Sequence, residues 1–265
     1  MNATPVVRNA KPIARPGENA PGVVATVVRA FALILRLFVE ALAPLKGDWL
    51  PVVIVLAALT MTVGNLVALT QDNVKRMLAY SSIAHTGYML VGLAAFAGGQ
   101  QLGIEGLLFY GAAYSFMNLG GFAVIAAMQK RAGVTSSLET FAGLGRREPK
   151  LGALMTLFLL SLTGIPPTAG FFAKALVILA AVQAGGWVSF LAVLAVINAA
   201  VAAFYYLRVV VYMYMREPVS AQEAPRHGRL LWGGLVVATA MTILLGFFPG
   251  LIMGIIGEAA TAISG

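Results

Sequence analysis

The sequence contains no cysteine, only two histidines and few charged residues, and each shortage excludes a class of protein. Without cysteine the chain forms no disulfide, no thiolate metal site and no cysteine-ligated iron–sulfur cluster. His85 and His227 lie in very different sequence settings, which argues against a histidine pair holding a haem. Charged residues make up 11% of the chain, against about 25% in soluble domains. We therefore expect that this chain binds neither a metal nor a cofactor, and that it is no ordinary soluble domain.

Apolar residues are abundant instead and account for 60% of the 265 positions. A helix of about 20 such residues crosses the hydrocarbon core of a bilayer. The composition therefore predicts an all-α, polytopic membrane protein with about seven transmembrane helices. The expected spans are 22–44, 49–70, 77–97, 103–128, 151–184, 187–215 and 230–248. Together they form a transmembrane domain over 22–250, preceded by an N-terminal arm (1–21) and followed by a short tail (251–265).

The fifth expected span, residues 151–184, is interrupted near its middle by Gly164, Pro166, Pro167 and Gly170. Proline removes a backbone donor and clashes with the preceding turn, so two helices are expected to meet there. The break leaves backbone groups without helical partners at membrane depth, which is tolerated only inside protein or beside a water-filled cavity. The span is therefore predicted to be a discontinuous helix, a feature typical of ion paths.

Lys174 follows this break and is flanked on both sides by apolar residues. It lies about 15 Å before the expected helix end at Ala184, which is too far for its ammonium to reach the bilayer surface comfortably. An unpaired cation at the centre of a transmembrane helix costs roughly 2.5 to 3.5 kcal/mol to insert. Two interpretations remain open: a proton-carrying lysine in an ion path, or a lysine paired with a carboxylate for packing alone.

The third expected span carries many polar residues around His85, which lies about 15 Å beyond Lys75 along the helix. Ser81 and Ser82 precede His85 by four and three positions, so they lie close to its helix face. A buried histidine can relay protons or can be a satisfied structural residue, and the spacing does not decide between these roles.

Three other charged residues within spans have simpler explanations. Arg36 and Glu40 are four positions apart, so they can pair on one helix face. Arg208 lies near enough to the end of its span for its guanidinium to reach the interface, and we assign it no role.

Basic residues are distributed unevenly between the two sides of the expected domain. On the side opposite the N-terminus the loops contain only Lys46. The loops on the N-terminal side contain Arg8, Lys11, Arg15, Lys75, Arg76, Lys130, Arg131, Arg146, Arg147, Lys150, Arg216, Arg226 and Arg229. By the positive-inside rule, a bacterial-type inner membrane would hold the N-terminus in the cytoplasm and the C-terminus outside. The net charge of +8 is then a topology signal, and no nucleic-acid partner is expected.

Three segments resemble a known family closely. Residues 64–66 (GNL), 68–76 (ALTQDNVKR) and 78–88 (LAYSSIAHTGY) resemble subunit N of the respiratory NADH–quinone oxidoreductase (complex I), the homologue of mitochondrial subunit 2. Residues 161–174 (SLTGIPPTAGFFAK) are similar to the twelfth helix of that family, and 205–208 (YYLR) match it one helix later. The resemblance runs from about Phe31 to Met215 and corresponds to the C-terminal half of the family.

This resemblance implies an antiporter-like subunit of fourteen helices with two inverted five-helix repeats, of which the present chain would supply the second. It implies proton translocation across the membrane, while NADH, flavin, iron–sulfur clusters and quinone belong to the rest of the complex. Lys174 matches the lysine beside the family's second helix break, and His85 matches its tenth-helix histidine. Both are expected to relay protons, with Lys75, Ser82 and Tyr114 as possible supporting residues.

The chain departs from the family pattern near its start. The family's eighth-helix lysine would fall at Val27, and Arg29 lies about 200° around the helix from that position. Most of the first repeat has no counterpart, so the expected partners are a chain that supplies it, the other membrane subunits of complex I and the lipid bilayer. Two alternatives remain open: a subunit of a cation/proton antiporter or membrane-bound hydrogenase, and a truncated, non-conducting assembly remnant.

Overall fold

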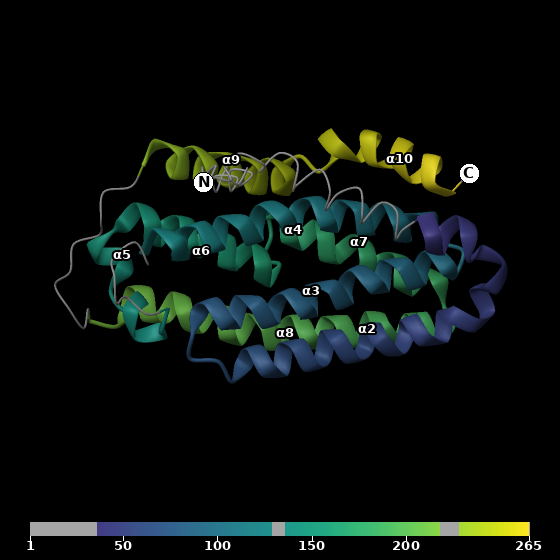
Figure 1. Ribbon diagram of the computed structural model, residues 1–265, viewed down its shortest axis with the longest axis horizontal. Helices are drawn as coiled ribbons and strands as arrows, with labels where there is room; N and C mark the ends of the chain where they lie inside the picture. The colour runs from purple at the N-terminus through teal and green to yellow at the C-terminus, as the bar shows by residue number, and fades with distance from the viewer. Residues whose placement is uncertain (1–35, 129–135, 218–227, 265) are drawn as a thin grey trace, which may run out of the picture.

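The structure is a computed structural model that describes residues 36–128, 136–217 and 228–264. Within these ranges the regular secondary structure is helical, and most long helices run along the long axis of the molecule (Figure 1). The main helices are α2 (Lys46–Leu69), α3 (Val74–Ala97), α4 (Gln101–Met128), α6 (Pro149–Thr163), α7 (Ala169–Ala184), α8 (Gly186–Met215), α9 (Arg229–Phe247) and α10 (Gly250–Ser264). The predicted all-α fold class is confirmed.

The beginning of the chain lies largely outside the described residues. The predicted arm (1–21), most of the first predicted span, and the positions Val27 and Arg29 all fall there. The side chain of Glu40 is also outside them, so its pairing with Arg36 stays a prediction. The described chain starts with a π-helical turn and a short 3₁₀ turn that lead directly into α2.

Four described segments are long and apolar enough to cross a membrane: Ala43–Leu69, Gln101–Met128, Gly186–Met215 and Arg229–Phe247. α6 and α7 have 15 and 16 residues, so neither half of the broken span is long enough to cross alone. α3 has 24 residues but carries more polar groups than the four apolar segments. More than half of the residues of α3 are buried, so other helices rather than lipid surround much of this polar helix.

α3 lies within the described bundle and packs against α2, α4, α7 and α8. Two glycines bring α3 and α2 close together. A Cβ atom on Gly87 would lie 2.6 Å from the backbone nitrogen of Met61, and one on Gly64 would lie 2.6 Å from that of Ala84. Small residues at such crossings let helix backbones approach closely. Of the polar side chains of α3, Ser81 and His85 are buried between helices, whereas Lys75 and Thr86 are exposed.

The two C-terminal helices lie along one side of the bundle, over α4 (Figure 1). α9 also contacts α6 and α7. α10 comprises residues that we predicted to form a short tail, and it packs on α4 with Ala260 buried in a small cluster with Ile104. The described end of the chain is therefore a packed helix.

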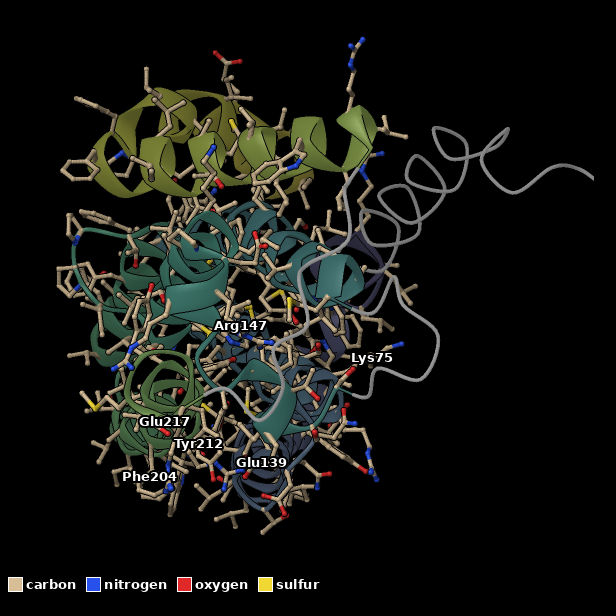
Figure 2. All side chains as sticks on the ribbon, turned by 90° about the vertical axis from the view of Figure 1, so that its left-hand side faces the viewer. Lys75, Glu139, Arg147, Phe204, Tyr212 and Glu217 are labelled. Atoms are coloured by element: carbon tan, nitrogen blue, oxygen red, sulfur yellow. The ribbon has the colours of Figure 1, made fainter. Side chains whose placement is uncertain are left out.

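The described basic residues of the predicted loops lie at one end of the bundle, the left end in Figure 1, which we call the basic end. Figure 2 looks onto this end and shows Lys75 and Arg147 there. Lys46 begins α2 at the opposite end. The helix order therefore separates the basic residues as the sequence predicts.

Arg208 joins α8 to the hinge between α2 and α3. Its guanidinium donates to the carbonyl of Gln71 and pairs with the Asp72 carboxylate at 3.3 Å. The same hinge bonds to the segment before α5 (Leu144–Arg147), since the Leu138 amide donates to the Asp72 carbonyl at 2.9 Å. We assigned Arg208 no role from the sequence, and the structure corrects this, because its side chain links two parts of the fold.

Candidate functional site at the helix break

α6 ends at Thr163 because Gly164 adopts the left-handed conformation (φ 92°) and the prolines that follow cannot continue the helix. The last four carbonyl groups of any helix lack partners within it. Here the amides of Gly164 and Ile165 turn back and donate to two of them, those of Leu160 and Ser161. Two carbonyls of the last turn remain for another donor.

Lys174 supplies that donor. Its Nζ atom donates to the carbonyls of Leu162 and Thr163 at 2.9 and 2.7 Å. Lys174 lies in the second turn of α7 and is 6% exposed. A side chain of the second half-helix therefore satisfies the open end of the first, and the helix break itself provides polar ligands for a buried ammonium.

Gly170 allows the two half-helices to come this close. Its amide donates to the Ser161 hydroxyl at 3.2 Å, and that hydroxyl also contacts the sulfur of Met117 on α4. A Cβ atom on Gly170 would overlap the Ser161 carbonyl oxygen. Any other residue at this position would push α7 away from α6 and draw Lys174 away from its carbonyl ligands.

The interpretation of Lys174 as half of an ion pair finds no support in the described part of the chain, where no carboxylate pairs with it. The face of the Tyr88 ring is its nearest aromatic neighbour, with Nζ 5.1 Å from the ring centroid. A cation within about 6 Å of an aromatic centroid is attracted by the ring quadrupole. Within the described residues, the ammonium is therefore held by backbone carbonyls and an aromatic ring, and no carboxylate pairs with it.

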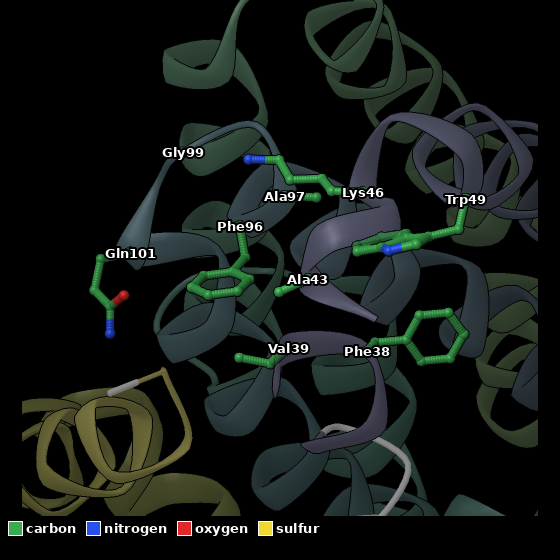
Figure 3. Close-up of a pocket in the computed structure, with 9 residues that line it drawn as sticks. All are labelled: Phe38, Val39, Ala43, Lys46, Trp49, Phe96, Ala97, Gly99 and Gln101. Carbon is green, nitrogen blue, oxygen red and sulfur yellow. The ribbon is translucent and has the colours of Figure 1, made fainter. Parts of the chain in front are cut away.

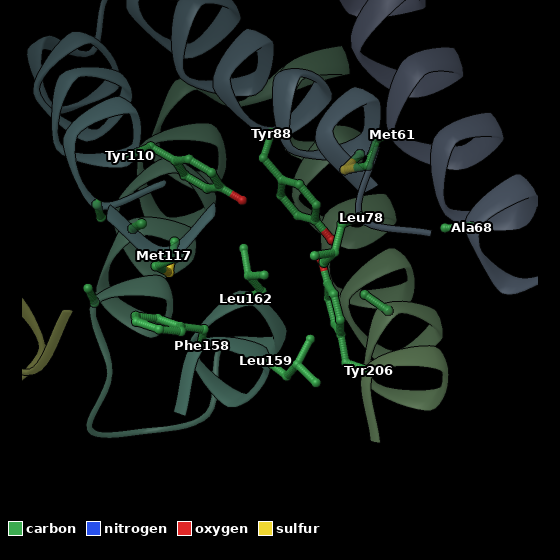
Figure 4. Close-up of a cluster of buried hydrophobic side chains, with 14 of the residues drawn as sticks. Met61, Ala68, Leu78, Tyr88, Tyr110, Met117, Phe158, Leu159, Leu162 and Tyr206 are labelled. Atoms are coloured by element: carbon green, nitrogen blue, oxygen red, sulfur yellow. The ribbon is translucent and has the colours of Figure 1, made fainter. Parts of the chain in front are cut away.

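His85 occupies the neighbouring part of the bundle and is 3% exposed. Its Nδ1 atom lies 2.7 Å from the Tyr110 hydroxyl, and its Nε2 atom lies 3.2 Å from the Tyr206 hydroxyl. The Tyr88 ring stands between the two predicted proton carriers, 6.1 Å from the His85 ring and in contact with Lys174. Figure 4 shows Tyr88, Tyr110 and Tyr206 directed into the interior of the bundle.

The possible supporting residues divide into two groups. The Tyr114 ring lies 4.7 Å from the His85 ring, and its hydroxyl donates to Ser82 at 2.7 Å. Ser82 in turn donates to the Leu78 carbonyl. Lys75 is exposed at the start of α3, at the basic end (Figure 2), and takes no part in this cluster. Tyr114 and Ser82 therefore join His85, whereas Lys75 does not.

Comparison with known proteins agrees with this geometry. A family model described as "NADH:quinone oxidoreductase/Mrp antiporter, TM" matches residues 21–200. The chain belongs to this family. It is 45% identical over 233 residues to "NADH-quinone oxidoreductase subunit N" of Trichlorobacter lovleyi, covering 88% of this chain and 47% of the relative. It is 49% identical over 224 residues to "NADH-quinone oxidoreductase subunit N 2" of Roseiflexus castenholzii, covering 83% and 44%.

Among solved structures, the chain is similar to one in respiratory complex I from Thermus thermophilus with bound aureothin. The TM-score is 0.63 at 35% identity, and the match covers 77% of this chain and 45% of that one. These likenesses confirm the predicted resemblance to subunit N. The chain spans about half the length of the curated relatives it matches.

This member of the NADH:quinone oxidoreductase/Mrp antiporter family has a second buried polar network that the sequence analysis missed. Asn65 on α2 donates to the Asn198 side-chain carbonyl on α8 at 3.0 Å, and Asn198 donates to Thr62 at 3.2 Å. Tyr205 donates to the Asn65 side-chain carbonyl at 2.9 Å. The available signal was a single side-chain amide in each of two largely apolar spans.

Other kinds of site among the described residues would be metal-binding clusters and cavities. Among the residues that the structure describes, no group of three or more His, Cys, Asp and Glu side chains could hold a metal ion. A cavity of about 330 Å³ lies near Lys46 and Trp49, at the end opposite the basic end (Figure 3). It contains neither Lys174 nor His85. In this family member, the helix break and the cluster around His85 are therefore the candidate site.

Proposed function

We propose that the chain is part of a proton-translocating membrane subunit of NADH–quinone oxidoreductase, and that Lys174 and His85 carry the proton. The observation that supports this most strongly is the ammonium of Lys174, held by the Leu162 and Thr163 carbonyls inside a helix break without a described carboxylate partner. Buried ionisable groups without a neutralising partner are costly in a membrane and mark ion paths. The relatives' names supply the complex in which this path would work.

The chemistry assigned to each residue follows from its surroundings. Backbone dipoles and the Tyr88 ring hold the ammonium of Lys174 without neutralising it, so a change in nearby charge can favour or oppose proton release. Lysine can lose and regain a proton in a buried site, whereas arginine keeps its proton. His85 offers two ring nitrogens within the same cluster. Quinone reduction would take place in other subunits, and no cofactor is assigned to this chain.

The proposal also covers the orientation of the chain in the membrane and its partner subunits. We infer that the basic end faces the cytoplasm and that Lys46 lies on the outer side of a bacterial-type inner membrane. The partners would be other membrane subunits of the complex. These inferences rest on the charge distribution and on the names of the relatives.

A cation/proton antiporter subunit is the second candidate, because the family model's description names both activities. The helix break and its lysine would suit either one. The relatives from Trichlorobacter lovleyi and Roseiflexus castenholzii are both named as NADH-quinone oxidoreductase subunits, which favours the first proposal. Sodium-dependent proton exchange in the absence of NADH would favour the second.

The test is NADH-driven proton pumping by the assembled complex in membrane vesicles, with electron transfer and assembly measured separately. Lys174→Ala should abolish most of the pumping by this subunit. Lys174→Gln keeps a donor for the carbonyls but carries no transferable proton, so it should assemble better than Lys174→Ala and still pump poorly. Lys150→Gln, at an exposed lysine of the basic end, is the matched control. Full pumping by assembled Lys174→Gln would overturn the role of Lys174 and leave a structural subunit.

A further inference from the structure

Both ring nitrogens of His85 face a tyrosine hydroxyl, Tyr110 at Nδ1 and Tyr206 at Nε2. A neutral imidazole has one N–H donor and one acceptor nitrogen, so one tyrosine must donate to the ring and the other must accept from it. Two arrangements are possible, and they differ in which nitrogen keeps a free lone pair for an incoming proton. The hydrogen bonds that the neighbouring groups already make determine which of the two arrangements is present.

The Tyr206 hydroxyl has two hydroxyl neighbours that already donate their protons to other groups. It meets the hydroxyls of Ser81 and Tyr205. Ser81 already donates its proton to the Leu78 carbonyl at 2.8 Å, and Tyr205 donates its proton to Asn65 at 2.9 Å. Both hydroxyls therefore offer lone pairs to Tyr206. Its own proton can go to one of them, which leaves the oxygen of Tyr206 free to accept from His85.

The direction of the Tyr205 bond is fixed farther along the network. The amide nitrogen of Asn65 donates to the backbone carbonyl of Met61 at 2.9 Å, and that of Asn198 donates to the carbonyl of Leu194 at 3.0 Å. Backbone carbonyls accept hydrogen bonds and never donate them. Neither amide can be turned over without losing such a bond, so the side-chain oxygen of Asn65 must face Tyr205 as an acceptor.

The Tyr110 hydroxyl differs from that of Tyr206 in having no second hydroxyl to receive its proton among the described residues. Within the described residues, the Nδ1 atom of His85 is the one hydrogen-bond partner of its hydroxyl. A buried hydroxyl that cannot donate loses a bond worth about 1 kcal/mol or more, so Tyr110 donates to Nδ1. The two distances agree, since 2.7 Å suits an O–H donor and 3.2 Å is within the range for an N–H donor.

We propose that Tyr110 and Tyr206 hold His85 in its neutral Nε2–H tautomer and thereby make Nδ1 the nitrogen that takes up a transported proton. The inference rests on the proposed function only for the last clause. A proton joining the Nδ1 lone pair converts the ring to imidazolium, and the Tyr110 hydroxyl turns from donor to acceptor. Loss of the same proton restores the first state. Tyr206 is a positioning residue, because its oxygen holds Nε2–H throughout.

The tautomer can be measured by solid-state NMR on the full chain labelled with ¹⁵N-histidine in lipid bilayers at neutral pH. His227→Asn leaves His85 as the one histidine, so the ring signals need no further assignment to a residue. Couplings to the ring hydrogens tell the two nitrogens apart. We expect a protonated Nε2 and an unprotonated Nδ1. A protonated Nδ1, or an even mixture of tautomers, would overturn the proposal.

Three tyrosine-to-phenylalanine variants test the two bonds separately. Tyr110→Phe should shift the unprotonated Nδ1 signal, and Tyr206→Phe should shift the protonated Nε2 signal. Tyr114→Phe is the matched control, because its ring also lies against His85 while its hydroxyl bonds to Ser82. If Tyr110→Phe instead shifted the protonated signal, the donor assignment would be reversed and wrong.

The wild-type tautomer decides the proposal even if a variant fails to fold, which thermal unfolding would reveal. The NMR result is also independent of the pumping assay. An Nε2–H tautomer with full pumping in assembled Lys174→Gln would end the proposed function and leave the tautomer assignment intact. An Nδ1–H tautomer together with lost pumping would overturn the tautomer assignment and leave the proposed function intact.

Discussion

The ammonium nitrogen of Lys174 lies 2.7 Å from the carbonyl oxygen of Thr163, the last residue of α6. One side chain therefore carries the buried charge and also completes the end of a helix. Leaving a buried acceptor without a donor costs about 1 to 3 kcal/mol. When a Lys174 variant loses transport, its stability must therefore be measured as well. Substitutions that keep a hydrogen-bond donor are more informative than alanine.

Gly170→Ala should destabilise the chain more than a helix substitution ordinarily does. The added methyl would overlap the Ser161 carbonyl oxygen, and overpacking of this kind costs about 1 to 3 kcal/mol. Thermal unfolding in detergent gives the comparison. Gly233→Ala on α9 is the control, because nothing lies within 4 Å of its added Cβ. Equal melting temperatures for the two variants would contradict the close approach of α6 and α7.

Asn65→Leu should lower the free energy of unfolding by about 1 to 3 kcal/mol, because it leaves the Tyr205 hydroxyl and the Asn198 amide without their partner. The double variant Asn65→Leu with Asn198→Leu removes one of these stranded groups as well. We therefore expect it to lose less than the sum of the two single variants. Denaturant or thermal unfolding of all four proteins completes the cycle, and strict additivity would show that the bond between α2 and α8 contributes nothing.

The orientation proposal can be tested with single cysteines, since the chain has none of its own. Gly47 and Glu139 are both exposed, Gly47 in the first turn of α2 and Glu139 at the basic end (Figure 2). An impermeant thiol reagent added to intact cells should label Gly47→Cys. Glu139→Cys should react only after the membrane is opened. Labelling in the reverse order would refute the cytoplasmic assignment of the basic end.

The sequence by itself determined the features that depend on neighbours along the chain. Gly164 and the two prolines end a helix through the geometry of a single turn, so the break between α6 and α7 was predictable. The apolar runs, the uneven distribution of basic residues and the position of Lys174 far from a helix end are likewise local. The family strings then predicted a proton-relay role for this lysine, and that role stays a prediction.

Only the tertiary structure decided the partners of these residues. Sequence reasoning placed Ser81 and Ser82 beside His85 because they share its helix face, yet the hydroxyls at the two ring nitrogens come from Tyr110 on α4 and Tyr206 on α8. Partners on other helices depend on how each helix is rotated about its axis, and that rotation is set by packing of many side chains at once.

The same reason explains Arg208 and Asn65. From its own span, Arg208 lay near a membrane surface, and only the position of the α2–α3 hinge showed that its guanidinium would meet the Gln71 carbonyl. Asn65 was one amide in an apolar run until α8 brought Asn198 against it. The position of a polar residue along its span determines how deep it lies in the membrane. Its hydrogen-bond partners at that depth belong to helices distant in sequence, which come together only in the folded bundle.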